Sequence, residues 1–131
     1  MTRLPEHLRA HFDRPEHVGE PAGGADLRGE ARNAACGDHV VVYVQREAES
    51  DPARVRAAGF RAQGCPAAMA TASAACSVIE GLAADAALPD AAARRFEARF
   101  GPPRPAHRHA LALFAEALSA LRPADPQRPR A

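Results

Sequence analysis

The stretch AACGDHVVVYV, residues Ala34–Val44, contains the clearest strand pattern of this chain. A thiol, Cys36, and a carboxylate, Asp38, lie directly before that strand. Residues Val40–Gln45 are mostly β-branched or aromatic, which is typical of a strand. The polar segment Arg46–Pro52 predicts a turn, and the loosely alternating Val55–Gln63 predicts a second strand. We expect the two strands to pair as an antiparallel hairpin.

Helical patterns flank this hairpin. The apolar spacing in Leu4–Phe12 predicts a short N-terminal helix. After the hairpin, Pro66 suits the first turn of a helix over Pro66–Glu80, and Gly81 suits its end. Two more helices are predicted: Ala91–Phe100, capped by Asp90 and closed by Gly101, and a C-terminal helix with an apolar stripe of Leu111, Phe114, Leu118 and Leu121.

The remaining segments have weaker patterns. Val18–Asn33 is rich in glycine and proline and predicts a loop-rich connection with one edge strand around Ala25–Ala31. The tail Pro123–Ala131 is expected to be frayed. The order of elements predicts an α+β fold with two or three antiparallel strands, as a single domain over residues 1–131 with its core at about 7–122.

The composition excludes several classes of function. The 17 basic and 16 acidic residues nearly cancel and form no run of like charge, so the electrostatic footprint expected for nucleic acid or an anionic membrane is missing. No apolar stretch reaches the roughly 20 residues that span a bilayer, and the first residues lack the apolar core of a signal peptide. There is no Gly-rich phosphate loop or nucleophile elbow. We expect a cytoplasmic protein with neither nucleic acid nor membrane as a partner.

Two of the three cysteines fall at the same end of the predicted hairpin. Cys36 precedes the first strand and Cys65 follows the second, so pairing brings both thiols and Asp38 to one edge of the sheet. Cys65 also takes the N-cap of the following helix, where backbone N–H groups and the helix dipole lower the pKa of a thiol. An odd cysteine count in a reducing compartment favours metal or sulfur chemistry over cross-linking.

A fourth candidate ligand lies at the start of the last predicted helix. His109 falls in its first turn, where the helix dipole disfavours the imidazolium and leaves the ring able to coordinate. Cys36, Asp38, Cys65 and His109 together would suit zinc, which accepts sulfur, nitrogen and carboxylate oxygen, or iron.

Each of these motifs also has an ordinary structural explanation. Cys36-Gly37-Asp38 resembles a turn with an Asp cap and a buried thiol, and His107 with His109 resembles an exposed helix start. The pairing of two such motifs across one hairpin is what favours a metal site. Cys76 lies on the same helix as Cys65 but about 16 Å along it, at about 1.5 Å per residue, and is expected to be a small buried hydrophobe.

The motifs resemble those of a known family, the iron–sulfur cluster assembly scaffolds of the NifU N-terminal, IscU and SufU type. The resemblance extends from about His7 to about Arg122. It is carried by HFDRPEHVG at 11–19, ARNAACGD at 31–38, FRAQGCPAA at 60–68, Ala72-Ser73 and Gly81. It implies a three-stranded antiparallel sheet packed by helices, with a solvent-facing site at one end.

In that family the site receives sulfur from a cysteine desulfurase, holds a labile [2Fe–2S] cluster, iron or a zinc ion, and passes the cluster to recipient apoproteins. By resemblance, Cys36, Asp38 and Cys65 match its first three ligating positions. The family's third cysteine is absent, because His109 is followed by Ala110. The segment Pro103–His107 also replaces the Leu-Pro-Pro-Val-Lys of an IscU-like protein.

Three functions remain open from the sequence. The first is a scaffold or carrier that uses Cys36, Asp38, Cys65 and His109, with Cys65 or Cys36 as persulfide acceptor. The second is a zinc-bound, SufU-type sulfur acceptor. The third is a non-catalytic relative that binds the desulfurase as a regulator. In each the chain is expected to be no enzyme in its own right and a monomer or weak dimer.

Overall fold

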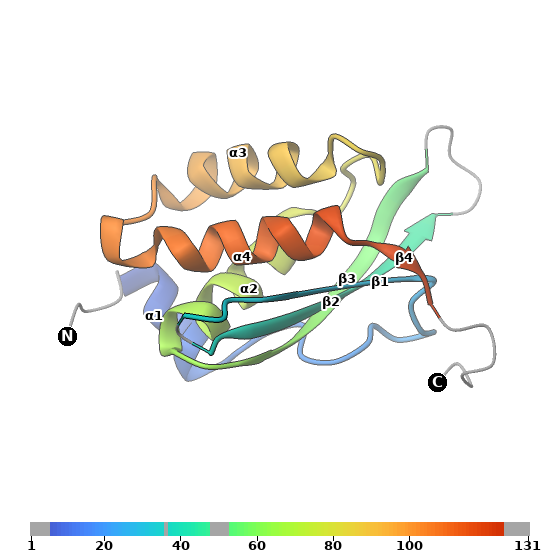
Figure 1. Ribbon diagram of the computed structural model, residues 1–131. Helices are drawn as coiled ribbons and strands as arrows, with labels where there is room; N and C mark the ends of the chain where they lie inside the picture. The colour runs from blue at the N-terminus through green and yellow to red at the C-terminus, as the bar shows by residue number, and fades with distance from the viewer. Residues whose placement is uncertain (1–5, 36, 48–52, 125–131) are drawn as a thin grey trace.

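A computed structural model describes residues 6–35, 37–47 and 53–124 of the chain as helices packed on a sheet (Figure 1). The elements follow one another in the order α1 (Glu6–Asp13), β1 (Leu27–Arg32), β2 (His39–Glu47), β3 (Arg54–Gln63), α2 (Pro66–Val78), α3 (Leu88–Phe100), the short 3-10 helix η1 (Pro105–His107), α4 (Arg108–Ser119) and β4 (Arg122–Pro123). The predicted α+β class, with an antiparallel sheet packed by helices in one domain, is confirmed.

The sheet has four strands in the order β3-β2-β1-β4. The predicted hairpin is present, with Val42 opposite Phe60 in an antiparallel register. The prediction of three strands is wrong, because Arg122 and Pro123 pair with the start of β1. Pro123 therefore lies in the sheet and not in a frayed tail, while residues 125–131 fall outside the described part of the chain. The strand predicted near Ala25–Ala31 is β1, and it lies inside the sheet instead of at its edge.

Three helices cover one face of this sheet. Helices α2 and α4 pack on the strands, and α3 packs on α2 and α4 from the outside (Figure 1). Helix α1 packs against α2. Alternate residues of β2 point into this helical layer, so Val40, Val42 and Val44 share the main core with Phe60 and Phe114. Burial of these side chains is the main favourable contribution to folding.

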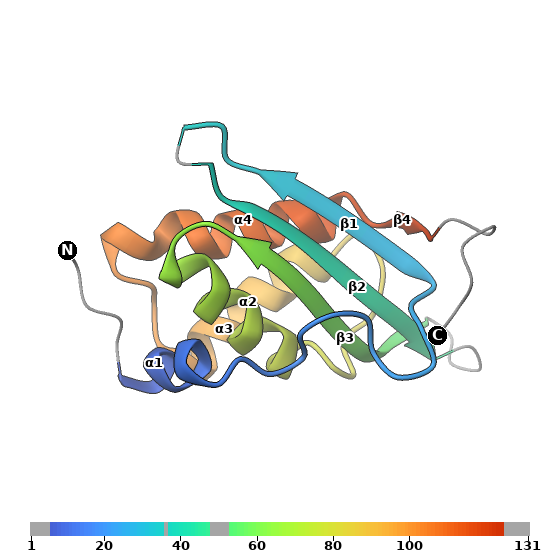
Figure 2. The same ribbon diagram turned by 90° about the horizontal axis from the view of Figure 1, so that it is seen from below.

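Residues 17–25, which we call the cover segment, run along the outer edge of β3 and end against the other face of the sheet. It runs alongside β3 (Figure 2) and forms a parallel bridge between Val18 and Phe60. The Gly19 N–H donates to the Phe60 carbonyl at 2.6 Å, and the Phe60 N–H donates to the His17 carbonyl at 2.9 Å. A side chain at Gly59 would overlap the Gly19 carbonyl oxygen, so this close crossing requires glycine.

The cover segment makes β2 a strand that is buried on both faces. Its residue Ala25 forms a second apolar cluster with Val41 and Tyr43, on the face away from the helices. The near-continuous apolar run in β2 reflects this double burial.

Two predicted helix features differ from the structure. Asp90 is not the cap of α3, because the helix begins at Leu88 and Pro89 occupies its first turn. The N–H of Ala87 instead donates to the Asp85 carboxylate at 2.9 Å. Helix α4 ends at Ser119, so Leu121 lies beyond it while still packing on the core.

In the described residues, no helix has both the length and the apolar character needed to cross a membrane.

Candidate metal centre

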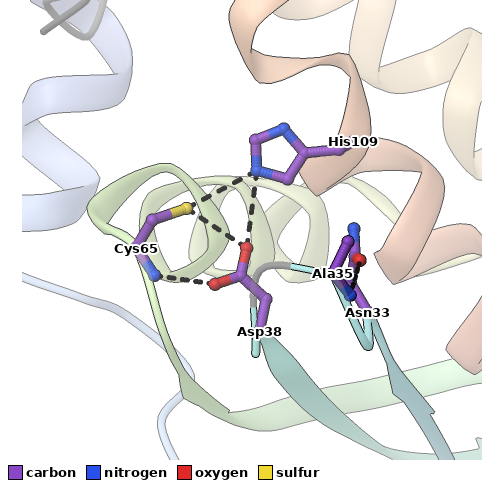
Figure 3. Close-up of polar contacts among 5 residues, drawn as sticks. All are labelled: Asn33, Ala35, Asp38, Cys65 and His109. Carbon is purple, nitrogen blue, oxygen red and sulfur yellow. Dashed lines mark hydrogen bonds and ion pairs between the residues drawn. The ribbon is translucent and has the colours of Figure 1, made fainter.

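The candidate site lies at one end of the sheet, where three elements converge. Asp38 directly precedes β2, and Cys65 follows the neighbouring strand β3 after one residue, Gly64, where His39 pairs with Gln63. His109 is the second residue of α4, whose N-terminal end lies over the same place (Figure 3). The structure therefore brings together three of the four predicted ligands.

The donor atoms of these residues are within reach of one ion. The Cys65 Sγ lies 3.3 Å from Oδ2 of Asp38 and 3.6 Å from Nε2 of His109, and that Nε2 lies 3.4 Å from the same Oδ2 (Figure 3). All three atoms lie within 4.8 Å of one another. A sulfur, a nitrogen and a carboxylate oxygen form a donor set that suits zinc or iron better than magnesium or calcium.

Asp38 is the most enclosed of the three residues, with 1% of its surface exposed. Its Oδ1 accepts a hydrogen bond from the Cys65 N–H at 2.9 Å, while Oδ2 faces the thiol and the imidazole. A buried carboxylate needs such partners because an unpaired buried charge is costly. The side chain of His109, by contrast, is 35% exposed, so the site opens to solvent on the α4 side.

The loop before Asp38 is held by its own hydrogen bonds. The Asn33 N–H donates to the Asp38 carbonyl at 2.8 Å, and the Gly37 N–H donates to the Asn33 carbonyl at 2.8 Å. The Asn33 side-chain oxygen accepts from the Ala35 N–H at 3.0 Å (Figure 3), a local turn typical of asparagine. Asn33 was not recognised as a site residue from the sequence, and only its position five residues before Asp38 could have indicated it.

Cys65 takes the N-cap of α2, as predicted, but the predicted lowering of its pKa is wrong. Burial raises the pKa of the Cys65 thiol, and the hydrogen bond and charge of Asp38 add to the rise. The backbone N–H groups of Ala67 and Ala68 act in the opposite direction without reversing it. Without an ion, the site therefore favours the thiol over the thiolate.

The other candidate residues have different positions. Cys36 lies outside the described residues, so its part in the site stays a prediction. Cys76 is fully buried in the main core, where burial raises its pKa above the ordinary range, which confirms the expectation of a small buried hydrophobe. Ala110, at the place of the family's third cysteine, is 2% exposed.

His107 does not join the donor group. It is 6% exposed at the N-cap of α4, and its Nδ1 is buried without a hydrogen-bond partner among the described residues. It lines a small hollow together with Leu8, Thr71 and Phe96. Burial is the main cause that lowers the pKa of His107, and the neighbouring Arg104 and His109 lower it further.

A larger hollow opens on the exposed side of His109. It has a volume of about 290 Å³ and is lined by the end of β1, the following loop and one side of α4: Arg32, Asn33, Ala34, His109, Ala112, Leu113 and Glu116. The hollow therefore adjoins the donor group at His109.

A sequence comparison places the chain in a known family. The sequence model of the NifU-like N-terminal domain matches residues 5–121. The chain belongs to this family. No curated protein was found to match it.

Solved structures have the same fold. One is a candidate iron–sulfur cluster assembly scaffold protein for the SUF system from Fervidobacterium islandicum AW-1, with 14% identity and a TM-score of 0.60 over 88% of this chain and 93% of that chain. Another is the N-terminal part of a nitrogen-fixing NifU-like protein from Brucella abortus, with 21% identity and a TM-score of 0.65 over 88% of each chain. At these identities the likeness shows the fold alone.

Proposed function

We propose that this protein is a scaffold or carrier in iron–sulfur cluster assembly, with iron or a labile [2Fe–2S] cluster as its cargo. Cys36, Asp38, Cys65 and His109 are the proposed ligands. The observation that carries the proposal is the convergence of the Asp38, Cys65 and His109 donor atoms within 4.8 Å of one another in a chain of the NifU-like family.

The mixed donor set supports a carrier more than a permanent cluster site. A carboxylate oxygen is a harder ligand than a thiolate and prefers harder metals, so it holds an iron–sulfur unit less firmly. The exposed side of His109 leaves the cargo open to a recipient apoprotein. Both features favour release of the cluster.

Sulfur for the cluster would come from the persulfide of a cysteine desulfurase, with Cys65 or Cys36 as acceptor. The acceptor thiolate attacks the outer persulfide sulfur, a new S–S bond forms, the old one breaks, and the donor thiolate leaves. This transfer needs no external oxidant, whereas conversion of the transferred sulfur to the sulfide of a cluster would need two electrons from a reductant. In Cys65 this step requires loss of the proton that Asp38 and burial stabilise, and a bound cation favours that loss.

A zinc-bound sulfur acceptor is the second candidate. It is favoured by the alanine at position 110, which provides no thiol at the start of α4, and by the nitrogen, sulfur and oxygen donors, which zinc accepts in a tetrahedron. In this alternative the ion orders the site and no cluster is built.

Metal and acid-labile sulfide analysis of protein purified without oxygen, together with its visible spectrum, tests the proposal. We expect iron and sulfide in similar amounts and a visible absorption that Cys65→Ser removes. Cys76→Ala is the matched control, because Cys76 lies in the core and outside the donor group.

The outcomes separate the alternatives. One zinc per chain without visible absorption after anaerobic addition of iron and sulfide would support the sulfur acceptor. No metal in any preparation would contradict both candidates and leave a regulator that binds the desulfurase. Cluster assembly that is unchanged in Cys65→Ser would contradict the proposed ligand set.

A further inference from the structure

We infer that Gly64 is a positioning residue for the Asp38 ligand, and that its missing side chain makes Asp38 bind an ion through one oxygen only. The inference rests on the proposed metal-binding function but concerns a residue outside the proposed ligands. It begins with the space between Gly64 and the carboxylate.

Gly64 has no room for a side chain. A Cβ atom there would overlap Oδ1 of Asp38 and would lie 2.8 Å from its Cγ and 2.9 Å from its Cα. Gly64 also has a φ of 127°, which residues with a side chain rarely adopt. Glycine therefore lets the Asp38 carboxylate lie directly against the backbone between β3 and α2.

This close approach determines what each carboxylate oxygen does. With Oδ1 against Gly64, it accepts the Cys65 N–H at 2.9 Å. Oδ2 is then the oxygen that faces the Cys65 Sγ at 3.3 Å and the His109 Nε2 at 3.4 Å. One oxygen is engaged by the backbone, and the other is directed at the site.

A carboxylate held in this way is a one-oxygen ligand. Calcium takes six to eight oxygen ligands and often binds carboxylates through both oxygens, whereas zinc takes four ligands in a tetrahedron. Groups that orient a ligand without touching the ion typically change metal affinity by about 10–100-fold when they are removed. Gly64 thus favours a four-coordinate, thiolate-accepting ion at this site.

The chain offers a matched control for substitution at Gly64. Gly81 also has a positive φ, of 86°, but a Cβ there would have no atom within 4 Å. Gly81→Ala therefore also places a side chain at a positive φ, but without the clash with Asp38. The part of the difference between the two variants that depends on the Asp38 side chain reports the contact with the carboxylate.

The first measurement is the affinity for zinc ions, by competition with a chromophoric chelator, in the full chain. We expect Gly64→Ala to weaken zinc binding by about 10–100-fold and Gly81→Ala to leave it within about twofold. Equal affinities in Gly64→Ala and the original protein would overturn the inference.

The second measurement needs no metal. Thermal unfolding of the metal-free chain is compared for Gly64→Ala and Gly81→Ala, alone and in combination with Asp38→Ala. We expect a larger fall in Tm for Gly64→Ala than for Gly81→Ala, and we expect the excess to shrink in the Asp38→Ala background, which lacks the carboxylate.

An excess of the same size with and without the Asp38 carboxylate would overturn the inference. Absence of zinc and iron binding by the original protein would instead contradict the proposed function. In that case coupling between positions 64 and 38 in metal-free unfolding would still support the placement of the carboxylate by Gly64. The two failures are therefore distinguishable.

Discussion

The two ends of α2 present the same side chain in opposite surroundings. At its N-cap, Cys65 is half-buried beside a carboxylate and an imidazole, and in its last turn Cys76 is fully buried among apolar side chains. Burial raises the pKa of both thiols. The comparison teaches that the side chains around a cysteine determine whether its thiol is a candidate ligand or part of the core.

The largest expected effect is a difference in chemical reactivity between these two cysteines. In the folded, metal-free chain, Cys65 is accessible to iodoacetamide, whereas Cys76 requires unfolding of the core before it can react. We expect Cys76 to react at least about 1,000-fold more slowly, because opening of the core costs several kcal/mol. Peptide mapping by mass spectrometry during alkylation measures both rates.

The same alkylation experiment reports the pKa of Cys65. Because its pKa is raised, the thiolate fraction at neutral pH is smaller than in a free thiol, and the rate should rise only at higher pH. A midpoint below that of a small model thiol would contradict the direction that we assign. Rapid alkylation of Cys76 in folded protein would break the comparison itself.

The next effect is the loss of metal affinity in His109→Ala. Removal of this nitrogen donor leaves Asp38 and Cys65 as the remaining proposed ligands of the described group. We expect zinc binding to weaken by about 100-fold or more. This loss exceeds the change expected when a group that only orients a ligand is removed. His107→Ala is the control, because His107 lies outside the donor group. Isothermal titration with zinc measures both, and an equal loss in the two variants would argue against His109 as the ligand.

A smaller effect is expected at the apolar end of α2. Cys76→Ser places a hydroxyl in the core at a fully buried position, which we expect to lower the free energy of unfolding by about 1–3 kcal/mol. Zinc affinity should not change. Urea denaturation followed by circular dichroism gives the stability, and a change in zinc affinity without a change in stability would contradict the assignment of Cys76 to the core.

The smallest effect concerns Glu30 on the exposed face of β1. The hydrogen bond from His39 and the nearby charge of Arg28 lower the pKa of Glu30. The Glu30 carboxylate therefore contributes to stability at pH values above its ordinary pKa, and this contribution is lost as the pH falls through the lowered pKa. Because both side chains are partly exposed, Glu30→Gln should change stability only slightly, and only above that pH range. Unfolding measured between pH 3 and 7 tests the sign.

Much of the site's position could be predicted from the sequence, because it depends on strong local patterns. The hairpin follows from two β-type runs, and its register places Asp38 next to Cys65. Pro66 indicates the start of α2, which puts Cys65 at the N-cap. The first turn of α4 then brings His109 to the same end of the sheet.

Other features depend on tertiary contacts that no local pattern indicates. Strand β4 is two residues long, and its pairing with β1 exists only because α4 ends beside that strand. The pKa of Cys65 is raised instead of lowered because burial and the Asp38 charge outweigh the helix N-terminus. The need for glycine at position 64 depends on the buried carboxylate of another element.

The cover segment has a consequence for the association state of the protein. It pairs with β3 at Phe60 and therefore blocks part of the outer edge of the sheet. A shortened chain that lacks this segment would expose the N–H and C=O groups of Phe60 together with Val41 and Tyr43 on the outer face. An open edge beside an apolar face is a template for pairing with another chain, so such a truncation should aggregate even though every proposed ligand is retained.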